Sequence, residues 1–345
     1  MQSTRTVNRP KSTMSSVLDT ATAVFDPPLA LRHPHVQSIL ASSPLRARLS
    51  RGRAASLLAA ARPEVLDCDA GVRLLGYYSR QPGEARGLVI LLHGWEGSAD
   101  SLYMLAAGGL AFEAGFDVFR LNFRDHGETH GLNEALFHSC RLDEVANAVR
   151  CVAALHPTPR SFLVGYSLGG NFALRIAAKA SDFRLPLTKV VAICPVLRPH
   201  STMQALESGL WIYREYFLRK WRRSLTAKAA FFPHLYDFGD LKRFPTLTAT
   251  TAFFVERYTE YPDLDSYLDG YSLTGDVLAR LAIPARLIAA RDDPVIPSAD
   301  LDEIARSAAL EVTLVARGGH CGFVENFRLG SWLDRHLLAE LASGR

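Results

Sequence analysis

Short apolar runs alternate with helical patterns along the chain from residue 64 onward. The runs are rich in Val, Ile and Leu and have the length of strands, whereas the segments between them repeat apolar residues at helical spacing. Continuous apolar strands separated by helices are typical of a mostly parallel sheet that is covered on both faces. We therefore predict an α/β fold with an eight-stranded sheet. The predicted strands are 64–68, 72–78, 88–93, 117–123, 161–167, 189–194, 285–290 and 311–316, and the predicted helices lie near 101–114, 141–155, 169–181, 299–308 and 325–342.

The part of the chain before residue 64 lacks this alternation. We expect residues 1–18 to form a disordered tail, although their basic, Ser/Thr-rich composition is also that of a transit peptide. Residues 19–63 are predicted to form an N-terminal arm. Its basic stretch 45–62 has helix-forming composition, and we expect a solvated helix there in preference to one that lies on a membrane. The α/β domain then occupies residues 64–345, and its first two strands meet at a tight turn, which predicts an antiparallel hairpin at one edge.

A long insertion interrupts the α/β alternation at about 199–282. It holds 16 of the chain's 33 aromatic residues and exceeds the usual length of a loop between strand and helix. We interpret it as a helical cap over the strand ends. Four aromatic residues of its long helix are candidates to line a substrate pocket, namely Trp211, Tyr213, Tyr216 and Phe217. The alternative is that they pack on the sheet. The basic residues within 219–223 of the same helix could contact anionic lipid headgroups, but we expect them to form a solvent-exposed face of the helix.

The composition of the chain argues against some classes of function. Hydrophobic residues make up 48% and charged residues 21% of the chain, and the net charge of +4 is too small to indicate nucleic-acid binding. The five cysteines are scattered without a CxxC pair, so we predict a reducing compartment, the cytoplasm. No apolar run reaches the roughly 18 residues of a membrane span, which leaves at most peripheral membrane contact.

The segment GYSLGG places a serine in a setting suited to nucleophilic catalysis. Ser167 lies in G-x-S-x-G, directly after the apolar run 161–164 and before the helical pattern that follows. This strand–turn–helix order exposes a serine hydroxyl at a helix N-terminus, where the dipole favours developing negative charge. Ser167 is therefore the predicted nucleophile, the alternative being a helix-capping serine between two packing glycines.

A serine nucleophile needs a base and an acid that orients the base. His320 follows the last predicted strand and is the predicted base. Asp292 and Asp293 both follow the preceding strand, and we choose Asp293 because it stands four residues before Pro297. The predicted oxyanion hole consists of the backbone N–H groups of Trp95, in the loop after strand 88–93, and Leu168.

The sequence indicates neither a metal nor a cofactor. His126 and His130 lie in DHGETHG, which lacks the helical H-E-x-x-H order of a zinc site. A Walker A motif and a dinucleotide-binding glycine pattern are also absent from the sequence.

Six segments together resemble the AB-hydrolase-4 group of α/β-hydrolases, which includes YheT-like bacterial hydrolases, embryogenesis-associated plant proteins and medium-chain fatty-acid ethyl ester synthase/esterases. The segments are HPHVQSIL (33–40), LLHGWEGS (91–98), LNFRDHG (121–127), GYSLGGN (165–171), ARDDPVIP (290–297) and GGHCGF (318–323).

The resemblance implies an α/β-hydrolase fold with a cap, the triad Ser167, Asp293 and His320, and oxyanion donors at Trp95 and Leu168. It further implies hydrolysis of carboxylic esters with short- to medium-chain or lipid-like acyl groups. Trp95 replaces the leucine expected in HGLEGS, which could reshape the acyl site. An acyltransferase or thioesterase that uses the same triad, or a non-catalytic binding protein with this fold, are the alternatives.

Overall fold

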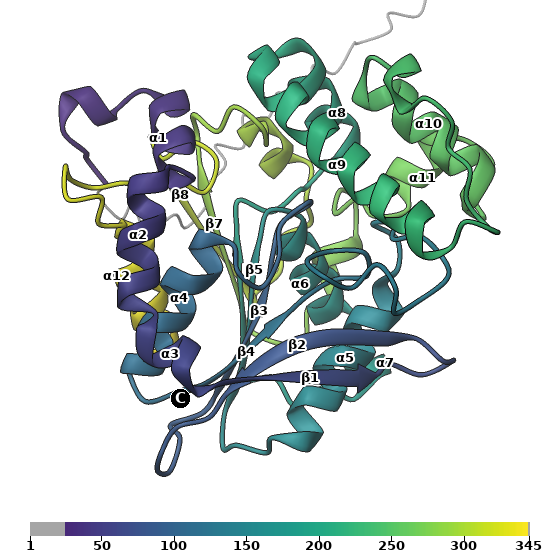
Figure 1. Cartoon of the computed structure of the whole chain (residues 1–345). Coiled ribbons are helices and arrows are strands. Elements are labelled where there is room, and N and C mark those ends of the chain that lie inside the picture. Colours follow the sequence, from purple (N-terminus) through teal and green to yellow (C-terminus); the bar gives the residue numbers. More distant parts are fainter. Residues whose placement is uncertain (1–24, 344–345) are drawn as a thin grey trace, which may run out of the picture.

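The computed structural model describes residues 25–343 and contains an eight-stranded sheet in the order β1-β2-β4-β3-β5-β6-β7-β8 (Figure 1). Strands β3 to β8 pair in parallel, whereas β1 pairs with β2, and β2 with β4, in antiparallel fashion. The predicted mostly parallel sheet and its edge hairpin are thus confirmed. The strands are β1 (Ala61–Asp67), β2 (Arg73–Ser79), β3 (Leu88–Leu92), β4 (Asp117–Leu121), β5 (Ser161–Tyr166), β6 (Lys189–Ile193), β7 (Ala285–Ala290) and β8 (Leu310–Val315).

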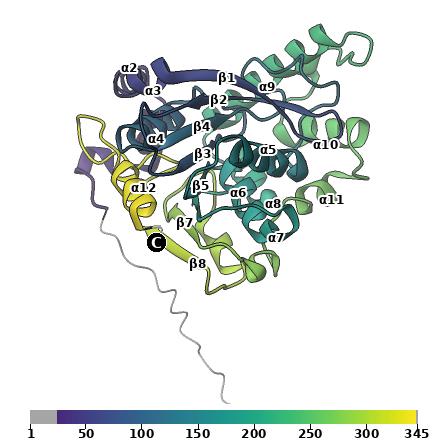
Figure 2. The same ribbon diagram turned by 90° about the horizontal axis from the view of Figure 1, so that it is seen from below.

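Helices cover both faces of the sheet (Figure 2). On one face α4 (Leu102–Glu113) and α12 (Trp332–Ser343) pack side by side, and on the other face α5 (Leu142–Leu155), α6 (Leu168–Ala178) and the short α7 (Ala180–Phe183) do so. Each layer buries its own cluster of apolar side chains against the sheet. The central strands are buried on both faces, which explains their continuous Val, Ile and Leu runs.

The N-terminal arm packs on the domain through one face of its helices, and the opposite face of the basic stretch is exposed to solvent. The 3₁₀ helix Leu29–Leu31 and α1 (Pro34–Ala41) are followed by α2 (Pro44–Arg53) and α3 (Ala55–Ala60). Ala54 and Leu57 are fully buried against the glycine pair of α4, where a Cβ at Gly108 would lie 2.9 Å from Leu57 Cδ2. The small residues of α4 therefore let the arm approach, and the weak amphipathicity of the arm concealed this contact. The predicted tail 1–18 lies outside the described residues.

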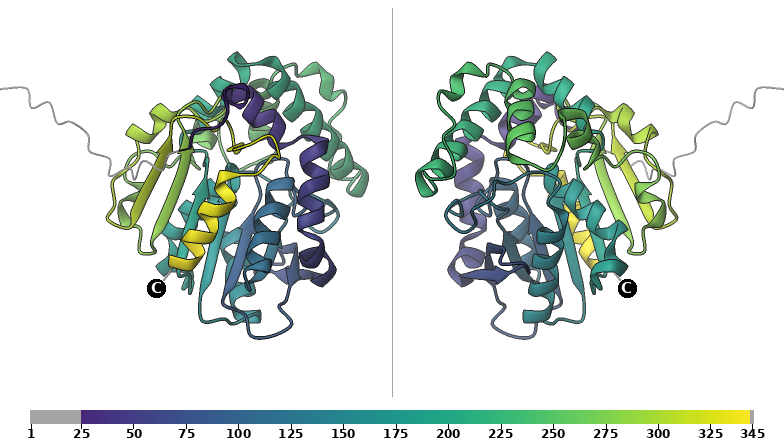
Figure 3. Two further views of the ribbon diagram at one scale, coloured as in Figure 1. Left: turned by 90° about the vertical axis from the view of Figure 1, so that its left-hand side faces the viewer. Right: turned by 90° about the vertical axis from the view of Figure 1, so that its right-hand side faces the viewer.

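The insertion forms a helical cap over the carboxyl ends of the parallel strands, as Figures 1 and 3 show. It contains α8 (Pro199–Ser208), α9 (Trp211–Phe231), the 3₁₀ helix Leu241–Arg243, α10 (Leu247–Tyr258), α11 (Leu264–Asp269) and the 3₁₀ helix Val277–Arg280. The cap covers the edge of the sheet at which loops of an α/β protein usually bind ligands. Its basic stretch is less solvated than we expected, because Lys220 and Arg222 donate to the carbonyls of Glu96 and Phe244, at 2.6 and 2.7 Å.

Two predicted helices are shorter than the sequence pattern suggested. The region 299–308 contains only the 3₁₀ helix Ser298–Asp302, because Glu303 O accepts from Gly275 N–H and Ile304 bridges Thr274. The helix expected from residue 325 begins at Trp332, since residues 324 and 331 pair across a turn. In both places the backbone pairs with another extended segment. Its N–H and C=O groups are therefore not free to form the hydrogen bonds of a helix.

Within residues 25–343 no helix combines the length and apolar character needed to cross a membrane.

Candidate active site

Ser167 lies at the turn between β5 and α6, with φ 53° and ψ −117°. This sparsely populated conformation is held by Ser167 N–H, which donates to Ile193 O at 2.8 Å, and by glycines at both ends of the turn. A Cβ at Gly165 would lie 2.1 Å from Gly169 O, and one at Gly169 would lie 2.4 Å from Leu92 O. The two motif glycines are thus required by backbone contacts, and they place the serine above the end of β5.

The structure brings Ser167, His320 and Asp293 into one hydrogen-bonded chain. His320 Nε2 lies 3.1 Å from Ser167 Oγ, and His320 Nδ1 lies 2.9 Å from Asp293 Oδ2. The other carboxylate oxygen of Asp293 accepts from the N–H groups of Val295 and Ile296, at 2.8 and 3.0 Å. Asp292 instead accepts from Gly319 N–H at 2.9 Å and ties down the loop that carries His320. Of the two candidate acids, only Asp293 contacts the imidazole.

The electrostatic surroundings of His320 favour its protonated form. Burial lowers the pKa of His320, but the Asp293 charge, the neighbouring Cys321 and the hydrogen bond to Asp293 outweigh it and raise the pKa to about 9. Asp293 is almost fully buried, so little solvent screens its charge from the ring. The carboxylate therefore stabilises an imidazolium and also fixes which ring nitrogen faces Ser167.

The N-terminal arm supports the loop of His320. The Gln37 side chain is fully buried and donates to Leu31 O and Val324 O, at 2.6 and 3.0 Å, while its Oε1 accepts from Val324 N–H at 2.6 Å. Ser38 Oγ accepts from His320 N–H at 2.9 Å. Gln37 and Ser38 lie in the segment HPHVQSIL, which carries the family resemblance, but nothing in the sequence marks them as positioning residues.

The two residues predicted to supply the oxyanion hole lie close to Ser167 in the structure. Trp95 and Leu168 line the same pocket as the serine, and neither N–H has a hydrogen-bond partner among residues 25–343. Leu168 is the first residue of α6, where N–H groups have no acceptor within the helix. Both predicted donors are thus available to an oxygen bound next to Ser167 Oγ.

Two buried histidines shape the loop that contains Trp95. His126 Nε2 accepts from Glu96 N–H at 3.1 Å, so its Nδ1 carries the proton and donates to Arg124 O at 2.7 Å. Burial lowers the pKa of His126 to about 4, which keeps the ring neutral and able to accept. His93 similarly accepts from Phe123 N–H at 3.1 Å. From the sequence, His126 is considered only as a possible zinc ligand, because the local segment DHGETHG does not indicate the contact with the distant Glu96.

A pocket of about 110 Å³ lies between the serine and the cap. Its walls come from the body and from α8, α9 and α10, and most of its side chains are apolar. They include Trp95, Phe137, Met203, Leu206, Phe217, Trp221, Leu247, Tyr271 and Val295. His138 also contributes to the wall, and burial lowers its pKa to about 3, so it is a neutral group in this pocket.

One of the four predicted pocket residues of the cap lies in this wall. Phe217 stacks on Trp95 with ring centroids 5.2 Å apart. Trp211 and Tyr216 are exposed to solvent, and Tyr213 OH is 2.9 Å from His35 Nδ1 at the contact between the cap and α1. The enrichment in aromatic residues predicted that the cap contributes to the wall of the pocket, as Phe217 does. Helix α9 directs the other three residues away from the pocket.

Comparisons with known proteins agree with this fold and site. A sequence model described as "alpha/beta hydrolase fold" matches residues 87–327. YheT of Escherichia coli, named as a candidate esterase, is 25% identical over 284 residues, which cover 76% of this chain and 82% of YheT. Human phospholipase ABHD3 is 22% identical over 256 residues, covering 72% of this chain and 62% of ABHD3.

Solved structures show the same fold. The Pyrococcus furiosus esterase Pf2001 superposes with a TM-score of 0.55 at 14% identity, covering 82% of this chain and 89% of Pf2001. A Rhizomucor miehei esterase has a TM-score of 0.54 at 18% identity, covering 93% of this chain and 98% of its own.

The chain belongs to the α/β-hydrolase fold family. Within that family, the matches to YheT and ABHD3 confirm the AB-hydrolase-4 resemblance.

Proposed function

We propose that the protein is a serine esterase that hydrolyses carboxylic esters through an acyl-enzyme on Ser167. The observation that carries this proposal is the continuous chain from Ser167 Oγ through His320 to Asp293, with contacts of 3.1 and 2.9 Å. A serine hydroxyl becomes nucleophilic when a neighbouring base accepts its proton, and His320 Nε2 is within reach of that proton.

The reaction proceeds in two halves. Ser167 Oγ attacks the ester carbonyl while His320 Nε2 takes the hydroxyl proton, and the Asp293 carboxylate stabilises the resulting imidazolium. The Trp95 and Leu168 N–H groups stabilise the negative oxygen of the tetrahedral intermediate. His320 then donates its proton to the leaving alcohol, and a water molecule, deprotonated by His320, hydrolyses the acyl-Ser167 intermediate.

The pocket beside Ser167 supports short- to medium-chain acyl groups as substrates. Its volume of about 110 Å³ compares with the roughly 150 Å³ of an engineered apolar cavity that binds benzene. Phe217, Leu206 and Met203 of the cap offer the acyl chain an apolar surface. All five cysteines are free thiols, which supports a reducing compartment, the cytoplasm, as the site of action.

Hydrolysis of p-nitrophenyl esters from acetate to laurate tests the proposal. We expect turnover to be highest for short or medium chains and to fall by about 10⁶-fold in the Ser167→Ala variant. Ser208→Ala, at an exposed serine of the cap, is the control and should retain full activity. Equal turnover by wild type and a folded Ser167→Ala variant would contradict the proposed nucleophile. A preference for thioesters of the same acyl chains would favour the thioesterase alternative.

A further inference from the structure

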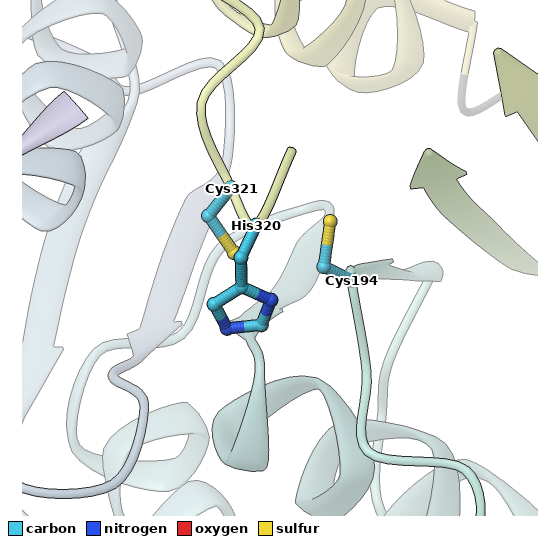
Figure 4. Close-up of side chains that lie close together, drawn as sticks. All are labelled: Cys194, His320 and Cys321. Carbon is cyan, nitrogen blue, oxygen red and sulfur yellow. The ribbon is translucent and has the colours of Figure 1, made fainter. Parts of the chain in front are cut away.

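Two cysteine side chains lie next to the His320 ring (Figure 4). Cys321 follows His320 directly, and Cys194 follows β6 at the other side of the site. One sulfur of each cysteine and one ring nitrogen of His320 all lie within 4.8 Å of one another. Both cysteines are buried and neither forms a disulfide, so two thiols and an imidazole lie close together.

The backbone holds both sulfurs in this position. Cys194 and Cys321 have positive φ angles of 43° and 54°, which turn their side chains toward each other's segments. Cys194 Sγ lies 4.0 Å from Gly319 O, and Cys321 Sγ lies 4.0 Å from Ile193 O. These two contacts join the end of β6 to the loop of the histidine.

We propose that Cys194, His320 and Cys321 form a binding site for a thiophilic divalent cation, for which Zn²⁺ is the probe. Two sulfurs and one imidazole nitrogen are a preferred donor set for zinc, with Zn–S bonds of about 2.3 Å and Zn–N bonds of about 2.0–2.1 Å. Movements of about 1 Å bring donors that start within 4.8 Å of one another to those distances. The fourth coordination position stays open to water.

Charge favours such a complex in a buried place. Binding converts two thiols to thiolates and also takes a proton from the ring wherever His320 is charged, so two or three protons go to solvent, with no change in oxidation state. The two thiolate charges neutralise the dication, so the site holds no net charge from the complex. An uncompensated ion in the same position would have a large desolvation cost.

Occupation of the site disarms the triad, a consequence that rests on the proposed esterase function. One ring nitrogen of His320 bonds to Asp293 and the other to Ser167. Whichever nitrogen the cation takes, the ring loses one of these two contacts. The bound cation therefore removes either the base or its orientation, and zinc is an inhibitor at this site.

The test uses the full chain under reducing conditions and measures metal binding separately from activity. We expect equilibrium dialysis to show one Zn²⁺ per chain, and Co²⁺ to give the absorption bands of a thiolate-bound tetrahedral ion. Cys194→Ser and Cys321→Ser should each weaken binding by more than about tenfold. Cys68→Ser, at another buried cysteine, should not. In the wild type, Zn²⁺ should inhibit ester turnover reversibly on addition of a chelator, and Mg²⁺ should not.

Absence of stoichiometric Zn²⁺ binding to the folded wild type would overturn the proposal. So would equal Zn²⁺ affinity in the wild type and in whichever of the two cysteine variants folds. Binding without thiolate–Co²⁺ bands would assign the cation to another site and would also contradict it. If the bands appear but no ester is hydrolysed even in metal-free protein, the proposed function fails while the metal site stands.

Discussion

At the scale of single residues, the site depends on strain and on buried hydrogen bonds. The Ser167 backbone has φ 53° and ψ −117°, a conformation that costs about 1–3 kcal/mol and persists only when neighbours enforce it. The glycines at 165 and 169 and the Ile193 carbonyl supply that enforcement. The adjacent residues Asp293 and Asp292 have different roles. Asp293 contacts the imidazole of His320, whereas Asp292 holds the loop that carries this histidine.

The two aspartates should respond differently to the same substitution. Asp293→Asn removes the charge that stabilises the imidazolium, and we expect kcat to fall by about 10⁴-fold. Asp292→Asn keeps an oxygen that can accept from Gly319 N–H, so kcat should change by less than about tenfold. Steady-state kinetics on both variants measure this difference. A larger loss in the Asp292 variant than in the Asp293 variant would reverse our assignment of the acid.

Activity should rise with pH because the base must be neutral. With the pKa of His320 raised from 6.5 to about 9, kcat/KM should increase between these values as the ring loses its proton. Asp293→Asn removes the main raising charge and should move the midpoint toward or below 6.5. A pH profile of kcat/KM for both proteins tests this, and a flat wild-type profile over that window would contradict it.

The same pKa shift has the opposite effect on stability. The folded state binds the His320 proton more tightly than the unfolded state, so its stabilisation is complete below about pH 6.5. It is lost as the pH rises toward 9. The difference in Tm between wild type and His320→Ala should therefore shrink over that interval.

At the scale of elements, a buried ion pair attaches the cap to the body. Lys228 of α9 is fully buried, and its Nζ donates to Asp125 Oδ1 at 2.8 Å in the loop after β4. It also donates to Asn133 O and Ala135 O, at 2.5 and 3.2 Å. Ser224 Oγ, one turn earlier, donates to Asp125 O at 3.1 Å. These contacts fix the carboxyl-terminal half of α9, while the amino-terminal half carries the exposed Trp211.

Removal of the lysine should destabilise the protein strongly. Lys228→Ala leaves the Asp125 carboxylate buried without a partner charge, and we expect a loss of about 3–5 kcal/mol. Lys242→Ala, at an exposed lysine of the cap, should change stability by less than about 0.5 kcal/mol. Urea unfolding measures both values. A loss below about 1 kcal/mol for Lys228→Ala would show that this pair does not hold the cap.

Prediction from sequence succeeded for elements with local signals. The central parallel strands were identifiable because buried parallel strands are apolar without interruption. The helix predicted at 299–308 failed because Ile304 pairs with Thr274, thirty positions earlier, and no local pattern records that contact. The pocket residues of α9 failed for a related reason, since the direction of each aromatic side chain depends on how the whole helix packs.

At the scale of the whole molecule, the N-terminal arm joins the domain and the site. Its helices pack on α4, and Gln37 and Ser38 bind the loop of His320 from the outside. The sequence marks the arm only by a resemblance, because the contacts of Gln37 and Ser38 lie more than 280 residues away along the chain. We infer that the arm is part of the catalytic body and does not extend from it.

Adjacent leucines of the arm test this inference. Leu57 is 1% exposed and packs on α4, whereas Leu58 is 36% exposed. Leu57→Ala should lower the free energy of unfolding by about 2–5 kcal/mol, because it leaves a cavity in the core. Leu58→Ala should cost less than about 1 kcal/mol. Equal, small effects in thermal unfolding would mean that the arm detaches in solution.

The most direct test of the central claim is covalent labelling with a fluorophosphonate, followed by intact mass and peptide mapping. The reagent phosphonylates a serine only when a neighbouring base activates it. We predict a single adduct per chain on the peptide that contains Ser167, and no adduct in Ser167→Ala. An adduct on another residue, or none on folded wild-type protein, would contradict an activated nucleophile at Ser167.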